Sequence, residues 1–142
     1  MKAVIDTSVI IDVDRRDADA IALMKKLTQK QIEVAISTVT LAEYLTGVFM
    51  NPRPDALQKG RELITQFSWI AMDAQIAEKT AFLLAEQLKN GRPVDFQDTV
   101  IASTFFEQFG DILITKNKKH FYQIPPGKCF SPKEYISLKE KK

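Results

Sequence analysis

The chain has 142 residues and a mass of 16.1 kDa, with 45% hydrophobic residues, 27% charged residues and a formal net charge of +2. This length and composition suit one compact domain spanning residues 1–142 and exclude long disorder or a collagen-like repeat. No apolar run approaches the roughly 20 residues that a bilayer requires, and Asp6 interrupts the first run too early for a signal peptide. We therefore expect a cytoplasmic protein with no membrane segment.

The first half of the chain predicts two strands, each followed by a helix. A short apolar run over residues 2–5 ends at Asp6 and indicates a buried strand. Asp17 suits the cap of a helix with an apolar face, and a second strand is expected over residues 32–36. Another helix follows that strand and ends at Asn51-Pro52. The residues expected to face inward on these helices are Ile21, Met24, Leu27, Leu41, Tyr44, Leu45 and Val48.

The second half continues this alternation. A helix is expected over residues 57–67, a short strand over 69–72, and then a helix capped by Asp73 that ends at Asn90-Gly91. A further helix begins near Asp95 and stops at Gly110, before a strand over residues 111–115. The residues expected to face inward on the last two helices are Ile76, Thr80, Leu83, Leu84, Leu88, Val100, Ile101, Phe105 and Phe109.

Strands that are continuous apolar runs, alternating with helices, predict a three-layer α/β/α domain with a mostly parallel central sheet. Residues 111–142 hold eight lysines and three acidic residues, and a short basic tail is expected from about residue 133. Ligands of open parallel sheets bind at the carboxyl ends of the strands, so the polar residues that follow each strand are the candidates for a site.

Each acidic candidate has two readings in the residue pattern. Asp6 either caps the next helix or contributes to a site. Glu43 lies three residues after Thr40, a spacing that also matches a capping box. Asp95 suits a helix cap, and Asp98 lies in the first turn, where the helix dipole favours negative charge.

Four fragments occur in a characteristic order along the chain: VIDTSVIID from residue 4, LAEYLTG from residue 41, DTVIAST from residue 98 and ITKNKKHF from residue 114. Together they resemble the PIN-domain ribonucleases, most closely the toxins of VapBC-type toxin–antitoxin pairs. The resemblance spans nearly the whole chain and implies a PIN-like fold.

The resemblance implies an endoribonuclease that depends on Mg²⁺ or Mn²⁺, with Asp6, Glu43 and Asp98 at the positions of the family's acidic metal-binding and catalytic triad. Hard divalent cations prefer oxygen ligands, which agrees with three carboxylates. Many members carry a fourth acid where this chain has His120, so Asp95 either joins the metal ligands or only caps its helix.

Thr7, Ser8 and Thr115 are expected to contact metal-bound water or the substrate phosphate, and Asn117 is expected to orient a carboxylate or the scissile phosphate. Lys116 lies beside the expected metal edge and is expected to contact the RNA backbone. The resemblance also implies three macromolecular partners, namely an RNA substrate, a small cognate antitoxin protein and a second copy of the chain in a homodimer. Two alternatives stay open: a non-catalytic PIN-fold module that binds RNA or protein, and a PIN nuclease that acts in RNA processing.

Overall fold

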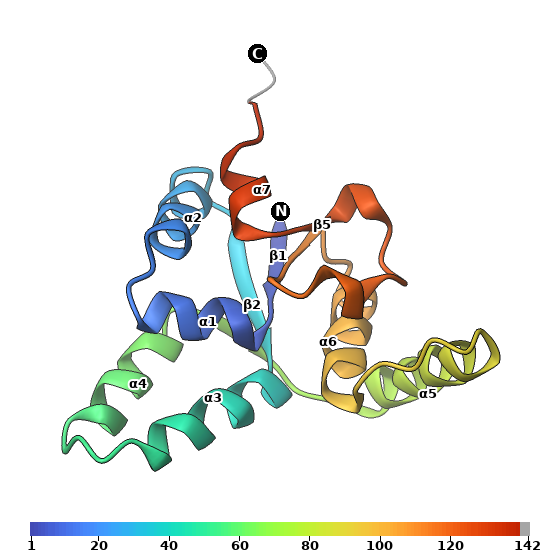
Figure 1. Cartoon of the computed structure of the whole chain (residues 1–142), viewed down its shortest axis with the longest axis horizontal. Helices are drawn as coiled ribbons and strands as arrows, with labels where there is room; N and C mark the ends of the chain where they lie inside the picture. The colour runs from blue at the N-terminus through green and yellow to red at the C-terminus, as the bar shows by residue number, and fades with distance from the viewer. Residues whose placement is uncertain (140–142) are drawn as a thin grey trace.

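The computed structural model describes residues 1–139, which form a five-stranded parallel sheet with the strand order β3-β2-β1-β4-β5 and helices on both faces (Figure 1). The strands are β1 (Lys2–Ile5), β2 (Glu33–Ser37), β3 (Ser68–Ile70), β4 (Ile112–Ile114) and β5 (Cys129–Phe130). The helices are α1 (Thr7–Asp14), α2 (Ala18–Gln29), α3 (Thr38–Met50), α4 (Ala56–Ile64), α5 (Ala74–Lys89), α6 (Phe96–Glu107) and α7 (Pro132–Ile136), and two 3₁₀ helices are η1 (Lys118–Phe121) and η2 (Pro126–Lys128). This confirms the predicted α/β class with a parallel sheet. The two-residue strand β5 is too short to leave a pattern in the sequence.

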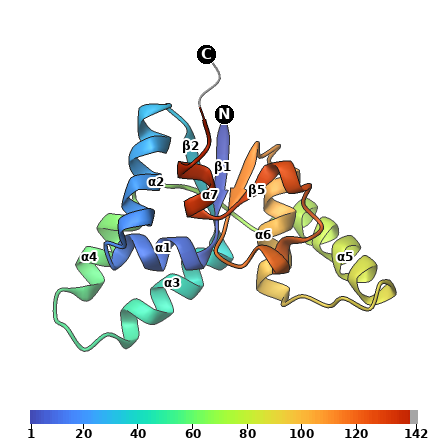
Figure 2. The same cartoon turned by 45° about the horizontal axis from the view of Figure 1, so that its top comes forward.

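Two hydrophobic cores cover the two faces of the sheet, because successive side chains of a strand point to opposite sides. Ala3 and Ile5 of β1 pack with α1, α2, α3, α4 and α7. Val4, between them, packs on the opposite face with α5, α6 and η1. Figures 1 and 2 show these two groups of helices on either side of the sheet. No helix within residues 1–139 is both long and apolar enough to span a membrane.

The inward faces of three helices differ from the sequence prediction. In α2 the buried stripe is Ala20, Leu23 and Leu27, while Ile21 and Met24 are half-buried. In α5 the prediction of Leu88 was wrong: its side chain is 74% exposed and Gln87 is buried instead, since Gln87 continues the four-three-four spacing of Ile76, Thr80 and Leu83.

The end of α6 also differs. Phe109 was expected to face inward but is 89% exposed, because the helix ends at Glu107 and the backbone of Phe109 is left-handed, with a φ of 51°. Gly110 then passes so close to the ring of Phe105 that a Cβ atom would lie 2.7 Å from it. The turn therefore requires glycine at residue 110.

The predicted basic tail is partly helical. Residues 132–136 form α7, whose Ser131 makes a capping box with Glu134. The ammonium group of Lys26 donates hydrogen bonds to the carbonyl oxygens of Tyr135 and Leu138, which fixes the end of this helix against α2. Residues 140–142 of the predicted tail lie outside the described residues.

Candidate functional site

Asp6 follows β1 directly and is almost wholly buried, with 2% of its surface exposed. One carboxylate oxygen, Oδ1, accepts hydrogen bonds from the Ser8 hydroxyl at 2.6 Å and from the Val9 amide at 3.3 Å. The other, Oδ2, accepts from the Thr115 hydroxyl at 2.5 Å. The side chain of Asp6 thus caps α1, as one of its two readings predicted, and it also bonds to the residue that follows β4.

Glu43 lies in the second turn of α3 and does not form the capping box that its spacing suggested. That reading is excluded because α3 begins one turn earlier than the motif requires: Ser37 is the cap, and its hydroxyl accepts from the amide of Val39. Thr40 is inside the helix. Glu43 is therefore free to accept a 2.8 Å hydrogen bond from the hydroxyl of Thr7, which begins α1.

Asp95 and Asp98 stand at the start of α6. Asp95 occupies the cap position, but its side chain makes no capping hydrogen bond, so its carboxylate is not committed to the helix end. Asp98 is half-buried, and its Oδ2 lies 2.7 Å from Nδ1 of His120, the residue that replaces the family's fourth acid. A carboxylate only accepts, so the imidazole presents its Nδ1–H to Asp98.

The four acids form one electrostatic cluster. Burial raises the pKa of Asp6, and the charge of Asp98 raises it further against the hydrogen bonds that Asp6 accepts. Burial likewise raises the pKa of Glu43, to which the charges of Asp98, Asp6 and Asp95 add. The fold therefore places the carboxylates of Asp6, Glu43, Asp98 and Asp95 near enough for their charges to interact.

This cluster is open rather than a closed cage. Among residues 1–139, no three Asp, Glu, His or Cys side chains already stand together at the spacing of a metal site. Mg²⁺ suits such an arrangement, because it usually takes one or two carboxylates directly and keeps several of its waters. A cation would also relieve the repulsion that raises the pKa values of Asp6 and Glu43. The donor set thus fits a hard divalent cation.

The other predicted residues surround the acids. Thr7, Ser8 and Thr115 each donate a hydroxyl hydrogen bond to a carboxylate, so they orient Glu43 and Asp6. The backbone amide of Lys116 donates to Ser8, and its ammonium group pairs with Asp12 at 2.7 Å. The backbone amide of Asn117 donates a 2.9 Å hydrogen bond to the hydroxyl oxygen of Thr115.

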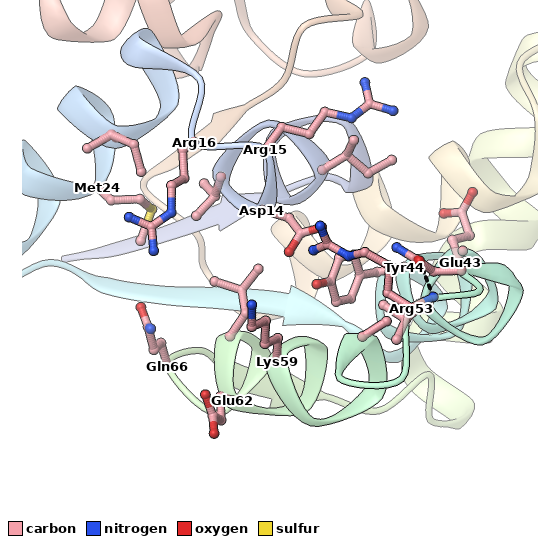
Figure 3. A pocket seen from close by; sticks show the side chains of 18 of the residues that line it. Asp14, Arg15, Arg16, Met24, Glu43, Tyr44, Arg53, Lys59, Glu62 and Gln66 are labelled. Atoms are coloured by element: carbon pink, nitrogen blue, oxygen red, sulfur yellow. Dashed lines mark hydrogen bonds between the residues drawn. The ribbon is translucent and has the colours of Figure 1, made fainter.

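A groove of about 1450 Å³ begins at Glu43 and runs between α1 and α2 on one wall and α3 and α4 on the other (Figure 3). Tyr44 lies in it with its hydroxyl buried and without a well-formed hydrogen bond to the described residues. Burial and the charge of Asp14 raise the pKa of Tyr44. The charged side chains of the lining are Asp14, Arg15, Arg16, Lys25, Glu43, Arg53, Lys59 and Glu62.

Sequence reasoning missed this groove and the pairing of His120 with Asp98. Arg15 and Arg16 follow the end of α1, whereas Lys59 lies in α4, and only the packing of these helices brings them to one groove. His120 was singled out by what it replaces, but nothing in the local pattern indicates its partner, which lies 22 residues away.

The chain is similar to known proteins in sequence and in fold. A family model described as "PIN domain" matches residues 3–125. A toxin–antitoxin complex from Klebsiella pneumoniae is 26% identical, with a TM-score of 0.73 over 92% of this chain and 97% of that one. VapBC2 from Rickettsia felis, bound to a DNA fragment from its promoter, is 22% identical with a TM-score of 0.77 over 92% and 97%. DNA-bound VapBC from Salmonella typhimurium is 24% identical, also at 0.77, over 93% and 98%. No curated protein matches the chain.

Proposed function

Because the chain belongs to the PIN-domain family, we propose that it is an endoribonuclease dependent on Mg²⁺ or Mn²⁺ and the toxin of a VapBC-type toxin–antitoxin pair. The observation that carries the proposal is the convergence of Asp6, Glu43 and Asp98 from the end of β1, from α3 and from α6. Solved structures with this fold include toxin–antitoxin complexes, which supports the toxin assignment.

In the proposed site, Asp6, Glu43 and Asp98 hold the cation, and Asp95 stands beside them. A bound divalent cation supplies an activated water for in-line attack on a phosphodiester and stabilises the charge that develops on its oxygens. The residues around the acids set their geometry: Ser8 and Thr115 hold Asp6, Thr7 holds Glu43, and His120 holds Asp98. Such supporting hydrogen bonds orient ligands and strengthen metal binding.

The remaining predicted residues belong to the substrate side of the proposal. Thr7, Ser8 and Thr115 line the edge at which the scissile phosphate is bound, and Asn117 orients it. Lys116 and the lysines of η1 guide the RNA backbone by phosphate contacts. The ion pair between Lys116 and Asp12 keeps that ammonium group beside the start of the site.

The test is cleavage of a labelled cellular RNA pool by the purified chain, free of antitoxin, with Mg²⁺ or Mn²⁺. We expect discrete fragments that disappear with EDTA and with Asp98→Asn. The matched control is the same substitution at an exposed aspartate, Asp55→Asn. Asp55 lies just before α4 and pairs with Lys59. Folded protein that binds RNA but cuts nothing with either metal would instead support the non-catalytic binding module.

We propose that the antitoxin binds in the groove that begins at Glu43. Its apolar lining and its excess of cations, with five Arg or Lys against three acids, complement an amphipathic segment that carries acidic residues. A basic residue of that segment next to Glu43 would compete with the metal for the carboxylates. Co-expression with a candidate antitoxin, where a small gene lies immediately upstream, tests this: the two proteins should purify together, and Arg15→Glu with Arg53→Glu should separate them.

We also propose a homodimer. Large apolar side chains remain exposed at the end of α3, where Phe49 and Met50 lie, and on α5, where Phe82 and Leu88 lie. Exposed apolar side chains of this size are typical of contact surfaces between subunits. Light scattering of the purified chain should give twice the monomer mass, and Phe49→Ser should lower it if α3 forms the contact.

A further inference from the structure

Arg92 lies in the loop that joins α5 to α6 and is exposed. Its guanidinium carbon lies 3.8 Å from the centroid of the Tyr122 ring. The hydroxyl of Tyr122 donates a 2.9 Å hydrogen bond to the carbonyl oxygen of Arg92. Tyr122 therefore contacts both the backbone and the guanidinium group of Arg92. Within residues 1–139 the guanidinium has no ion-pair partner. A stacked, uncompensated cation is therefore presented to solvent in one fixed orientation.

The loop beneath Arg92 is anchored by Gln87, which is buried. The carbonyl oxygen of Gln87 accepts from the amide of Arg92 at 2.9 Å, and its side-chain oxygen accepts from the amide of Val94 at 3.0 Å. Its side-chain amide donates to Thr99 and to Gln123. These bonds tie the end of α5, the loop, α6 and the segment after η1 together. Little conformational freedom remains to be lost when a ligand binds to this loop.

This anchored loop leads directly into the acid cluster. Arg92 precedes Asp95 by three residues, so their Cα atoms lie at most about 10 Å apart. Tyr122 follows His120 by two residues, and His120 contacts Asp98. Figure 2 shows the yellow loop before α6 and the orange-red segment around η1 meeting near the first turn of α6.

We propose that Arg92, stacked on Tyr122, is an RNA-binding residue that takes an unpaired base of single-stranded RNA on the open face of its guanidinium. The proposal rests on the nuclease function, since the strand is the one whose phosphate reaches Asp6, Glu43 and Asp98. Single-stranded RNA is recognised through unstacked bases placed on aromatic rings and on arginine planes. An acidic protein segment would need only a point charge, which a lysine supplies without a supporting ring.

Fluorescence anisotropy with a labelled single-stranded oligoribonucleotide of about 12 nucleotides tests this, because that length matches the usual site size of single-strand binding proteins. The titration is run in EDTA, so that the proposed metal-dependent cleavage of the probe cannot occur. We expect Arg92→Ala to weaken binding by about 5- to 100-fold, the range for loss of one stacked base. Arg92→Lys, which keeps the charge and loses the plane, should weaken it nearly as much. Arg61→Ala, at another exposed arginine on α4, is the matched control and should bind as the native chain does.

The outcomes separate this inference from the nuclease function. Metal-dependent cleavage together with native affinity in Arg92→Ala would overturn the inference alone. Arg92-dependent binding without cleavage would overturn the nuclease and leave the inference standing. Native RNA affinity in Arg92→Lys would show that a positive charge suffices, and would overturn the proposal that a base stacks on the guanidinium. Normal RNA binding with loss of antitoxin binding in Arg92→Ala would assign the residue to a protein partner instead.

Discussion

The hydroxyl of Thr115 donates a 2.5 Å hydrogen bond to Oδ2 of Asp6, although 109 residues separate the two in the chain. The contact follows from the sheet register: Ile5 of β1 pairs with Ile114 of β4, so the residues that follow these strands are neighbours. Asp6 is buried, and burial raises its pKa, while the donors Thr115 and Ser8 act in the opposite direction. Thr115 is thus part of what keeps a buried carboxylate ionised.

Thr115→Val should therefore raise the pKa of Asp6 further and weaken divalent-cation binding. Valine keeps the shape of threonine but removes the donor, and loss of such a supporting hydrogen bond typically costs about 10- to 100-fold in metal affinity or activity. Calorimetric titration with Mn²⁺ measures the affinity. Thr115→Ser retains the hydroxyl and is the control; equal affinities for all three proteins would contradict the role of this contact.

Glu43→Gln should raise the thermal midpoint of the metal-free protein at pH 7.5, by about 1–3 °C. The pKa of Glu43 is raised above its ordinary value of 4.5, chiefly by burial, so the folded state binds the proton more tightly than the unfolded state. Ionisation of Glu43 consequently costs the native chain stability as the pH rises from about 4.5 through the raised pKa, and the glutamine variant lacks this contribution. Thermal unfolding in EDTA at pH 7.5 and pH 4 checks this. A difference between the two proteins that is the same at both pH values would contradict it.

Mg²⁺ or Mn²⁺ should stabilise the chain against heat. Asp6, Glu43, Asp95 and Asp98 repel one another in the folded state only, so a cation that binds among them favours folding. Binding at about 100 times the dissociation constant adds about 2.7 kcal/mol to the free energy of unfolding. Differential scanning fluorimetry with increasing Mn²⁺ measures the shift. Asp98→Asn should show a smaller one, and an undiminished shift in that variant would place the cation elsewhere.

Gln87→Leu should lower the free energy of unfolding by about 1–3 kcal/mol, the usual cost of leaving buried polar groups unpaired. The change removes the partners of Thr99, Gln123 and the Val94 amide at once. The matched control is Glu86→Gln on an exposed neighbour in α5, which should change stability by no more than about 0.5 kcal/mol. Urea unfolding measures both, and a larger loss in the control than in Gln87→Leu would contradict the buried role of Gln87.

The sequence by itself determined the order of the main elements and the edge at which the acids meet. The apolar runs at residues 2–5 and 112–114 form strands, and Asp17 and Asp73 cap helices as predicted. These features are local, because hydrophobic periodicity and helix capping depend on residues that are close together in the chain. Because the strands are parallel, their carboxyl ends share one edge, and Asp6 had to lie there with Thr115.

Only the tertiary structure decided the partners of those residues and the phase of the helices. Glu43 accepts a hydrogen bond from Thr7, 36 residues away in the chain, and forms no capping box with Thr40. Asp98 is hydrogen-bonded to His120, 22 residues away. The inward turn of Gln87 instead of Leu88 and the stacking of Arg92 on Tyr122 depend on how α5 and α6 pack against η1. Such pairings are set by the fit of distant surfaces, which no spacing within one segment encodes.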